Sequence, residues 1–415
     1  MEFPVMYKIE QEFDTCKIKD TKETVLRELE PLKNMIRPGM RIAITAGSRG
    51  IANICLILKT TVDYVKSLGA KPFIVPAMGS HGEATTEGQI KVLEKLGITT
   101  EIMGVPIISS MEVVNIGETF DGVPVYIDKN AFNADGIIVV NRVKQHTDFH
   151  GEIESGLMKM LAVGLGKHHG CSTIHAHGLR DTIPKVARVL LKKTPVLFGL
   201  AILENSRDEV YKLKGVLPQD FEREDKLLLK ESKAIVPTLP WDDLDILVVD
   251  EMGKNFSGTG MDTKIIGRIR VPGEEEMKTP RINKIVVLRL SEDSCGNALG
   301  IGLADITTKA LVDKIDFKVT YANIILTTYL ERGKIPLIME NDKEAIKTAM
   351  LTIGNIPIDK IKLAVIPNTV HLEELHATSA AIEDIMDKSK ISVLDEGYPM
   401  SFDGRGALRI HWRKV

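Results

Sequence analysis

Residues 41–50 read RIAITAGSRG, an apolar run followed by a glycine-rich turn. The run predicts a strand over Arg41–Ala46, and residues 51–68 then carry apolar side chains at helical spacing. A second strand is predicted at 71–75 and a second helix at 88–96. Strands that alternate with helices in this way form a mostly parallel sheet with helices on its faces. These residues therefore indicate an α/β fold.

The same alternation continues along the chain and predicts two domains. The first half adds strands at 136–141 and 195–202 and helices at 184–192 and 220–233, and the second half adds strands at 245–250, 284–290 and 361–366 and helices at 303–316, 343–354 and 372–387. Prolines at 237 and 240 mark a boundary between the halves. A chain of 415 residues also exceeds the size at which one core keeps growing. We expect two α/β domains with mostly parallel sheets, residues 1–238 and 239–415, with an active site in the cleft between them.

Composition excludes several classes of partner. The chain is 44% hydrophobic and 27% charged, with a net charge of −3, which gives no electrostatic reason to expect a polyphosphate partner such as nucleic acid. Its four cysteines form no CxxC pair, which suits a reducing compartment. The longest apolar run, residues 196–203, is too short to cross a bilayer, and the first residues lack a signal-peptide core. We expect a cytoplasmic protein without nucleic-acid or membrane partners, and the oligomeric state stays open.

Histidines gather in one segment. Six of the ten lie between residues 146 and 177, namely His146, His150, His168, His169, His175 and His177. Lys159 and Cys171 lie in the same segment. Imidazole moves protons near neutral pH and binds transition metals, so the chemistry is predicted here. We assign no role to His168, His169 or His177, which read as solvated loop residues.

Two glycine-rich loops follow the first two strands and precede helices. The first contains Gly47, Ser48 and Arg49, and the guanidinium of Arg49 suits a substrate carboxylate. The second projects His81 from between two glycines. Both positions lie at the carboxyl ends of predicted strands, where α/β proteins bind ligands.

The first loop is close to the dinucleotide fingerprint of short-chain dehydrogenases, but three features argue against nicotinamide binding. Ala46 and Ala52 replace expected glycines, and the second strand ends without an acidic residue for the ribose. No tyrosine has a lysine four residues further on.

Other chemistries remain open at this point. A zinc hydrolase would use His146 and His150 with His175 or Cys171, although no HExxH spacing is present. Lys159 lies in an apolar stretch that suits a Schiff-base lysine. In the second half, a loop that could form a phosphate nest contains Lys254, Ser257, Gly258, Thr259 and Gly260.

Together these residues resemble the lactate racemase superfamily, whose members use a nickel-pincer nucleotide. The resemblance implies an N-terminal catalytic domain in which Arg49 binds the substrate carboxylate, His81 and His146 are the two bases, Lys159 anchors the cofactor and His175 ligates nickel. The spacing from Lys159 to His175 is the strongest agreement. The gap from His146 to Lys159 is longer than in the family, so His150 competes for the second base.

The resemblance implies an isomerase, a racemase or epimerase of a 2-hydroxy acid. In this scheme hydride leaves Cα for the nickel-pincer nucleotide and returns to the opposite face, while imidazoles exchange the hydroxyl proton. Gly47 and Ser48 would help to bind the cofactor, together with the loop of Lys254 and residues 257–260. The chain looks more like an uncharacterised branch than like lactate racemase itself, so the substrate side chain stays open. The alternatives are the zinc hydrolase and a non-catalytic protein that binds a nucleotide or hydroxy acid.

Overall fold

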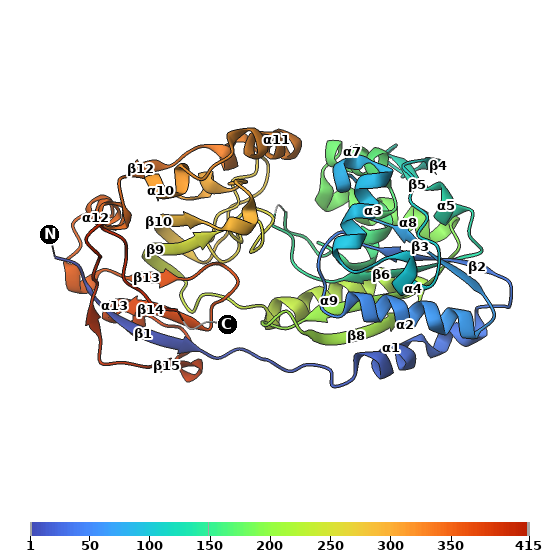
Figure 1. The fold of residues 1–415 in the computed structure, drawn as a ribbon, viewed down its shortest axis with the longest axis horizontal. Helices are drawn as coiled ribbons and strands as arrows, with labels where there is room; N and C mark the ends of the chain where they lie inside the picture. The colour runs from blue at the N-terminus through green and yellow to red at the C-terminus, as the bar shows by residue number, and fades with distance from the viewer. Residues whose placement is uncertain (1, 148, 413–415) are drawn as a thin grey trace. The chain divides into compact units, whose positions relative to one another are not determined.

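The computed structural model describes residues 2–147 and 149–412. It divides into two compact units (Figure 1). One unit is Asp14–Val236, and the other combines Met1–Phe13 with Pro237–Val415. Each unit is an α/β layer structure with parallel strands at its centre, so the predicted fold class is confirmed.

The unit Asp14–Val236 is built on a five-stranded sheet. In the described residues its order is β3 (Lys71–Pro76), β2 (Arg41–Ala46), β6 (Gly136–Arg142), β7 (Val196–Glu204) and β8 (Val210–Val216). The first four strands are parallel, and β8 pairs antiparallel with β7. The strand predicted at 41–46 is therefore present near the centre of this sheet. Because β3, β2, β6 and β7 are parallel, their carboxyl ends share one edge.

Helices cover both faces of this sheet (Figure 1). Ile42 and Ile44 of β2 pack into one core, while Ala43 between them packs into the other, because successive side chains of a strand point to opposite faces. The first face is covered by α1 (Thr21–Leu29), α2 (Ile54–Ser67), α3 (Thr86–Lys95) and α4 (Thr100–Met103). The second face is covered by α5 (Lys129–Phe132), α6 (Gly156–Lys159), α7 (Lys167–Ala176), α8 (Leu179–Lys193), α9 (Phe221–Ile235) and the hairpin of β4 (Val113–Glu118) and β5 (Pro124–Asp128).

The other unit contains a larger, mixed sheet. Within the described residues five strands run parallel, in the order β12 (Leu337–Met339), β11 (Ile306–Thr308), β10 (Arg281–Leu290), β9 (Asp243–Met252) and β13 (Leu363–Ile366). Antiparallel strands follow: β14 (Glu374–Thr378), β1 (Val5–Gln11) and β15 (Ile391–Val393), with β16 (Tyr398–Pro399) also paired to β1. The helices are α10 (Lys309–Val312), α11 (Phe317–Thr327), α12 (Asp342–Thr352) and α13 (Ser379–Glu383).

The predicted first domain, 1–238, differs from the structure at its amino-terminal end. Strand β1 pairs with β14, β15 and β16 and so lies in the sheet of the second unit. Met6 and Ile9 of β1 are fully buried, and each packs into a different core of that unit. This pairing joins segments about as far apart in sequence as the chain allows, and no local pattern in the first residues announces it.

Two helices predicted in the second half are wrong. Residues 303–316 form β11 and the short helix α10, and residues 372–387 form β14 and α13. Ile306 and Thr307 pair with β10 on one side and β12 on the other, which favours β-branched side chains. A short apolar run fits both helix and strand periods, so periodicity alone does not separate the two.

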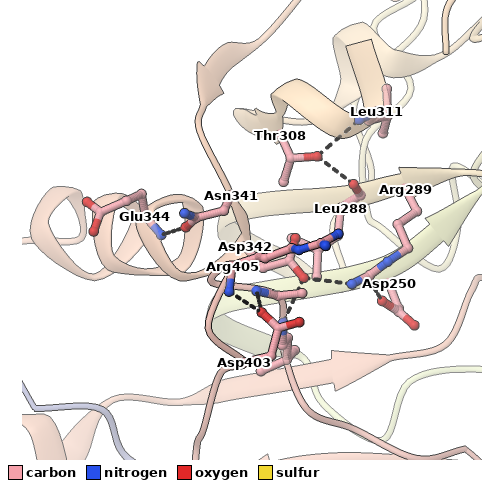
Figure 2. A network of polar contacts seen from close by, with 12 residues as sticks. Asp250, Leu288, Arg289, Thr308, Leu311, Asn341, Asp342, Glu344, Asp403 and Arg405 are labelled. Atoms are coloured by element: carbon pink, nitrogen blue, oxygen red, sulfur yellow. Dashed lines mark hydrogen bonds and ion pairs between the residues drawn. The ribbon is translucent and has the colours of Figure 1, made fainter. Parts of the chain in front are cut away.

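A network of charged groups ties the carboxyl-terminal segment to the second sheet (Figure 2). Arg289 of β10 pairs with Asp250 of β9 and, at 2.7 Å, with Asp342 at the start of α12. Asp342 also accepts the backbone N–H of Leu408, and Asp250 accepts the indole N–H of Trp412 at 2.9 Å. Burial raises the pKa of Asp250, and the neighbouring guanidinium opposes that shift.

In the described part of the chain, no helix combines the length and the apolar character needed to cross a bilayer.

Ile9→Ala tests the assignment of β1 to the second unit. We expect a loss of about 2–5 kcal/mol, because a fully buried side chain leaves a cavity. Both tryptophans, Trp241 and Trp412, lie in this unit, so intrinsic fluorescence during urea unfolding reports on it directly. Val5→Ala, at a position of the same strand that is 46% exposed, should change the midpoint little. An unchanged tryptophan transition in Ile9→Ala would contradict the assignment.

Candidate active site

Three segments that follow parallel strands meet at one edge of the first sheet. Ser48, after β2, bonds through its hydroxyl to Nδ1 of His81, after β3. A Cβ built on Gly47 would lie 3.3 Å from the Met160 side chain, so the first loop also touches the residue next to Lys159. The backbone N–H of Gly79 donates to the carbonyl of Gly164 at 3.2 Å. The structure thus brings the loops of Arg49 and His81 to the segment of Lys159.

His146 and Lys159 share one aromatic partner. The ring of His146 lies 4.6 Å from that of Phe149, measured between centroids. The ammonium of Lys159 lies 5.8 Å from the centroid of the same Phe149 ring, within the range of a cation–π contact. Phe149 itself is buried. Two of the predicted site residues are therefore brought together on one hydrophobic support.

The loop between β6 and α6 is shaped by a carboxylate that the sequence pattern does not single out. Glu154 is fully buried and accepts the backbone N–H of His146 at 2.8 Å and that of Gly151 at 3.3 Å. Lys233 of α9 adds an ion pair at 2.8 Å. A buried carboxylate needs such partners, because its desolvation is costly. An isolated glutamate in a polar loop carries no sequence signal that distinguishes it from a solvated one.

The two histidines that compete for the role of second base contact Glu154 in different ways. Nδ1 of His150 lies 4.0 Å from a carboxylate oxygen of Glu154. His146, by contrast, meets Glu154 through its backbone, and its ring turns to Phe149. His146 and His150 therefore meet Glu154 differently, and the Phe149 ring contacted by His146 is also contacted by the ammonium of Lys159.

Lys159 ends a short helix whose first turn is held by another buried carboxylate. Asp225 of α9 accepts the backbone N–H groups of Leu157 at 3.1 Å and Met158 at 2.8 Å. Gly156 has a φ of +82°, and a Cβ there would lie 2.4 Å from an Asp225 oxygen, so glycine is required. A π-helical turn, Met160–Gly164, follows α6 directly, a feature that often accompanies functional sites. Burial raises the pKa of Asp225 to about 7, while the two N–H groups favour the charged form.

His175 lies on a helix that the sequence pattern does not predict. It is exposed on α7, one turn beyond Cys171, whose sulfur lies 3.8 Å from the hydroxyl of Ser80. Residues four apart on a helix share a face, so His175 lies on the same face of α7 as Cys171. Cys171 in turn contacts Ser80 in the loop of His81. His168 and His169 are exposed on the same helix, and His177 caps it. The glycines around this helix conceal its periodicity in the sequence.

The predicted phosphate loop lies in the other unit. The hydroxyls of Ser257 and Thr259 are 3.0 Å apart, and both residues are buried. Lys254 donates from its ammonium to the carbonyl of Gly258 and, at 3.0 Å, to Asn323. Gly260 adopts a φ of +71°, and a Cβ added there would lie 2.7 Å from the Leu299 carbonyl oxygen, which excludes a larger residue. Binding of a phosphate by this loop stays a prediction.

A metal site of the zinc type takes at least three ligands from the protein. Within residues 2–147 and 149–412, no three His, Cys, Asp or Glu side chains gather closely enough to hold a metal ion. The zinc alternative, with His146 and His150 plus His175 or Cys171, therefore has no support in this part of the chain.

Comparison with known proteins agrees with the resemblance inferred from the sequence. Residues 8–184 match the family model described as the lactate racemase N-terminal domain. Among solved structures, the lactate racemase apoprotein from Thermoanaerobacterium thermosaccharolyticum is similar, with 13% identity over 88% of this chain and 98% of that chain and a TM-score of 0.49. No curated protein matches the chain.

Asp225→Asn tests the buried carboxylate beneath Lys159. The folded chain holds the Asp225 proton up to about pH 7, whereas an unfolded chain releases it near pH 3.8. Between these values the folded state binds more protons, so the stability from this group falls as pH rises. We expect the free energy of unfolding of the wild type, relative to Asp225→Asn, to decrease from about pH 4 to 7, by an amount on the order of 4 kcal/mol at most.

Urea unfolding followed by circular dichroism across this pH range measures the difference. Leu227→Ala, at an exposed side chain of the same helix, changes no titratable group, so it serves as the control and its difference from the wild type should not depend on pH. A flat difference for Asp225→Asn as well would show that its carboxylate is solvated or paired in the folded protein.

Proposed function

We propose, from the premise that residues 8–184 resemble a lactate racemase N-terminal domain, that the chain is an isomerase that inverts a 2-hydroxy acid with a nickel-pincer nucleotide. The observation that carries this proposal is the meeting of the loops after β2, β3 and β6. Ser48 contacts His81, and His146 and Lys159 contact one phenylalanine ring. Inversion of a carbon centre needs groups on both of its faces, and separate loops can supply them.

Arg49 would bind the substrate. It is exposed in the loop after β2, next to Ser48, and a guanidinium forms two parallel hydrogen bonds with a carboxylate. This grip would fix the carboxylate and so orient the adjacent carbinol. A lysine at this position would keep the positive charge but could not form the two parallel hydrogen bonds.

His81 and His146 would move the hydroxyl proton. The contact of Ser48 with Nδ1 of His81 supports this role, because it holds the orientation of that imidazole. We propose His146 rather than His150 as the second base because its ring and the Lys159 ammonium contact the same Phe149 ring. One imidazole takes the hydroxyl proton as the carbonyl of a planar 2-keto acid forms, and the other returns a proton when the centre is restored with opposite configuration. The overall reaction is redox-neutral.

The donor set fits a metal that arrives with ligands of its own. Because no three-residue metal cage is found in the described residues, a bare metal ion would lack ligands there. We propose that the exposed imidazole of His175 would be a ligand to the nickel of such a nucleotide. The partly buried amine of Lys159, on a turn held by Asp225, is proposed as the covalent anchor.

When bound, the nickel-pincer nucleotide would supply reversible acceptance of a hydride from the substrate Cα. Gly47 and Ser48 are proposed to contact this cofactor, since their loop touches Met160 beside Lys159. The loop of Lys254 and residues 257–260 is proposed as a phosphate-binding loop.

Metal analysis and intact mass test the proposal on protein purified from cells that make the cofactor. We expect nickel and an added mass in the wild type, loss of the added mass in Lys159→Ala, and loss of nickel in His175→Ala. His81→Ala and His146→Ala should keep nickel and lose about 10²–10⁴-fold in turnover of a chiral 2-hydroxy acid, the usual contribution of a general acid or base. His168→Ala, at an exposed histidine of the same helix, is the matched control and should change none of these.

Three results would contradict the proposal. Wild-type protein that never carries nickel would exclude the cofactor. One equivalent of zinc without nickel would favour the hydrolase. Binding of hydroxy acids without inversion, across a panel of both enantiomers, would favour a non-catalytic binding protein.

A further inference from the structure

A fully buried lysine lies beneath the His81 loop, residues 77–82. Lys167 is the first residue of α7 and is 0% exposed. Its ammonium contacts three oxygens: the carbonyl of Pro76 at 2.5 Å, Oε1 of Gln89 at 3.1 Å and Oδ2 of Asp128 at 3.3 Å. Lysine is among the residues least often buried, so three converging oxygens need an explanation beyond packing.

Gln89 continues this contact to the loop itself. It is also fully buried, in α3. Its amide N–H₂ donates to the carbonyl of Gly79 at 3.0 Å and to that of His81 at 3.3 Å. The orientation of the amide is fixed by chemistry, because an ammonium offers only donors and must face the amide oxygen. Lys167 therefore holds the end of β3 directly and holds the backbone of His81 through Gln89.

The partners of this group come from four elements. Asp128 ends β5, is fully buried and accepts two N–H groups at the start of α5. Pro76 ends β3, Gln89 belongs to α3 and Lys167 begins α7. Burial lowers the pKa of Lys167 and raises that of Asp128, and the charge of each opposes the shift of the other. A buried pair of this kind gains little net stability over apolar side chains, so specificity of geometry is its best-attested use.

The local backbone supports a positioning role. Lys167 has a φ of +53°, a left-handed conformation that costs energy for a side chain of this kind. Glu83 and Ala84, directly after the loop, also have positive φ values. These left-handed residues lie in α7 and directly after the loop, and Gln89 bonds to two carbonyls of the loop itself.

We propose that Asp128, Lys167 and Gln89 form a buried positioning relay that fixes the His81 loop against α7, the helix of His175. The relay sets the separation between the imidazole assigned to the substrate proton and the imidazole assigned to nickel. None of the three side chains touches substrate in this assignment; each acts through the backbone of residues 76–81. The proposal deepens the proposed function and rests on it for the roles of His81 and His175, but the relay itself consists only of side chains of this chain.

Amide hydrogen exchange on the protein without added substrate or cofactor tests the relay. The N–H groups of Gly79, His81 and Ala84 bond to Gly164, Met78 and Ser80, so they report on the loop. The N–H of Val140 bonds to the Thr45 hydroxyl in the sheet and reports on global unfolding. Gln89→Met removes both donations to the loop, and Gln89→Glu keeps an acceptor for Lys167 while removing the amide donor.

We expect both Gln89 variants to speed exchange of the loop N–H groups by about 10-fold or more, with Val140 unchanged, as for a local opening. The ring Nδ1 resonance of His81, which senses Ser48, should shift in both. Lys167→Met combined with Asp128→Asn removes the ion pair without leaving a buried charge and should reproduce the effect. Adding Gln89→Met to that pair should give no further increase, because the three residues act in series.

Lys129→Met is the matched control, since Lys129 is an exposed lysine beside Asp128 that pairs with Glu112. It should leave the loop exchange unchanged. Equal acceleration at Val140 and at the loop would reduce the relay to a contribution to global stability and overturn the proposal. Unchanged exchange in Gln89→Glu would do the same. Neither outcome depends on nickel or on turnover, so failure of the relay is distinguishable from failure of the proposed function.

Discussion

The parallel pairing of β2 with β3 on one side and β6 on the other is the constraint on which the candidate site depends. It sends three chain segments out of one edge of the sheet. Ser48 and His81 then meet because their strands are neighbours, although 33 residues separate them in the chain. His146 and Lys159 follow from the third strand. A shift in the register of β2 would therefore move Ser48 and Arg49 away from both His81 and the segment of His146 and Lys159.

Buried charges perform the finer positioning. Glu154 holds the backbone of His146, Asp225 holds the turn before Lys159, and Lys167 holds the loop of His81. Each of these three is fully buried or nearly so, and each costs desolvation energy that only hydrogen bonds or an opposite charge offset. Apolar side chains would fill the same space more cheaply but would not specify where a backbone N–H or carbonyl lies. Accurate placement of site residues explains why polar groups occupy these positions.

The sequence was sufficient for the four parallel strands of the first unit, but not for β8, and the site residues stay a prediction. Strand Arg41–Ala46 and the glycine-rich loops carry strong local signals, and a histidine after a strand is a recognisable pattern. The supporting residues were not predictable in this way. Lys167 stands between Gly166 and two histidines, in a stretch whose glycines concealed helix α7, and its partner Asp128 is 39 residues away in the chain. The prediction that β1 belongs to the first domain was wrong for the same reason, since its partner strands lie near the opposite end of the chain.

The predicted site residues and the buried residues that support them are constrained by different requirements. This difference determines how a substitution at each kind of position would change activity. A side chain that contacts substrate is limited by the chemistry of the reaction, and the proposed function gives His81 and Arg49 this role. A buried support is limited by geometry, and its replacement can displace a catalytic group without removing it. Because Gln89 bonds to the carbonyl of His81 and not to its ring, a change at Gln89 would leave the imidazole chemistry intact and alter only its position. Since a displacement of about 1 Å can cost 10²-fold in rate, the positions beneath the loop are where substrate range could shift while the reaction is kept.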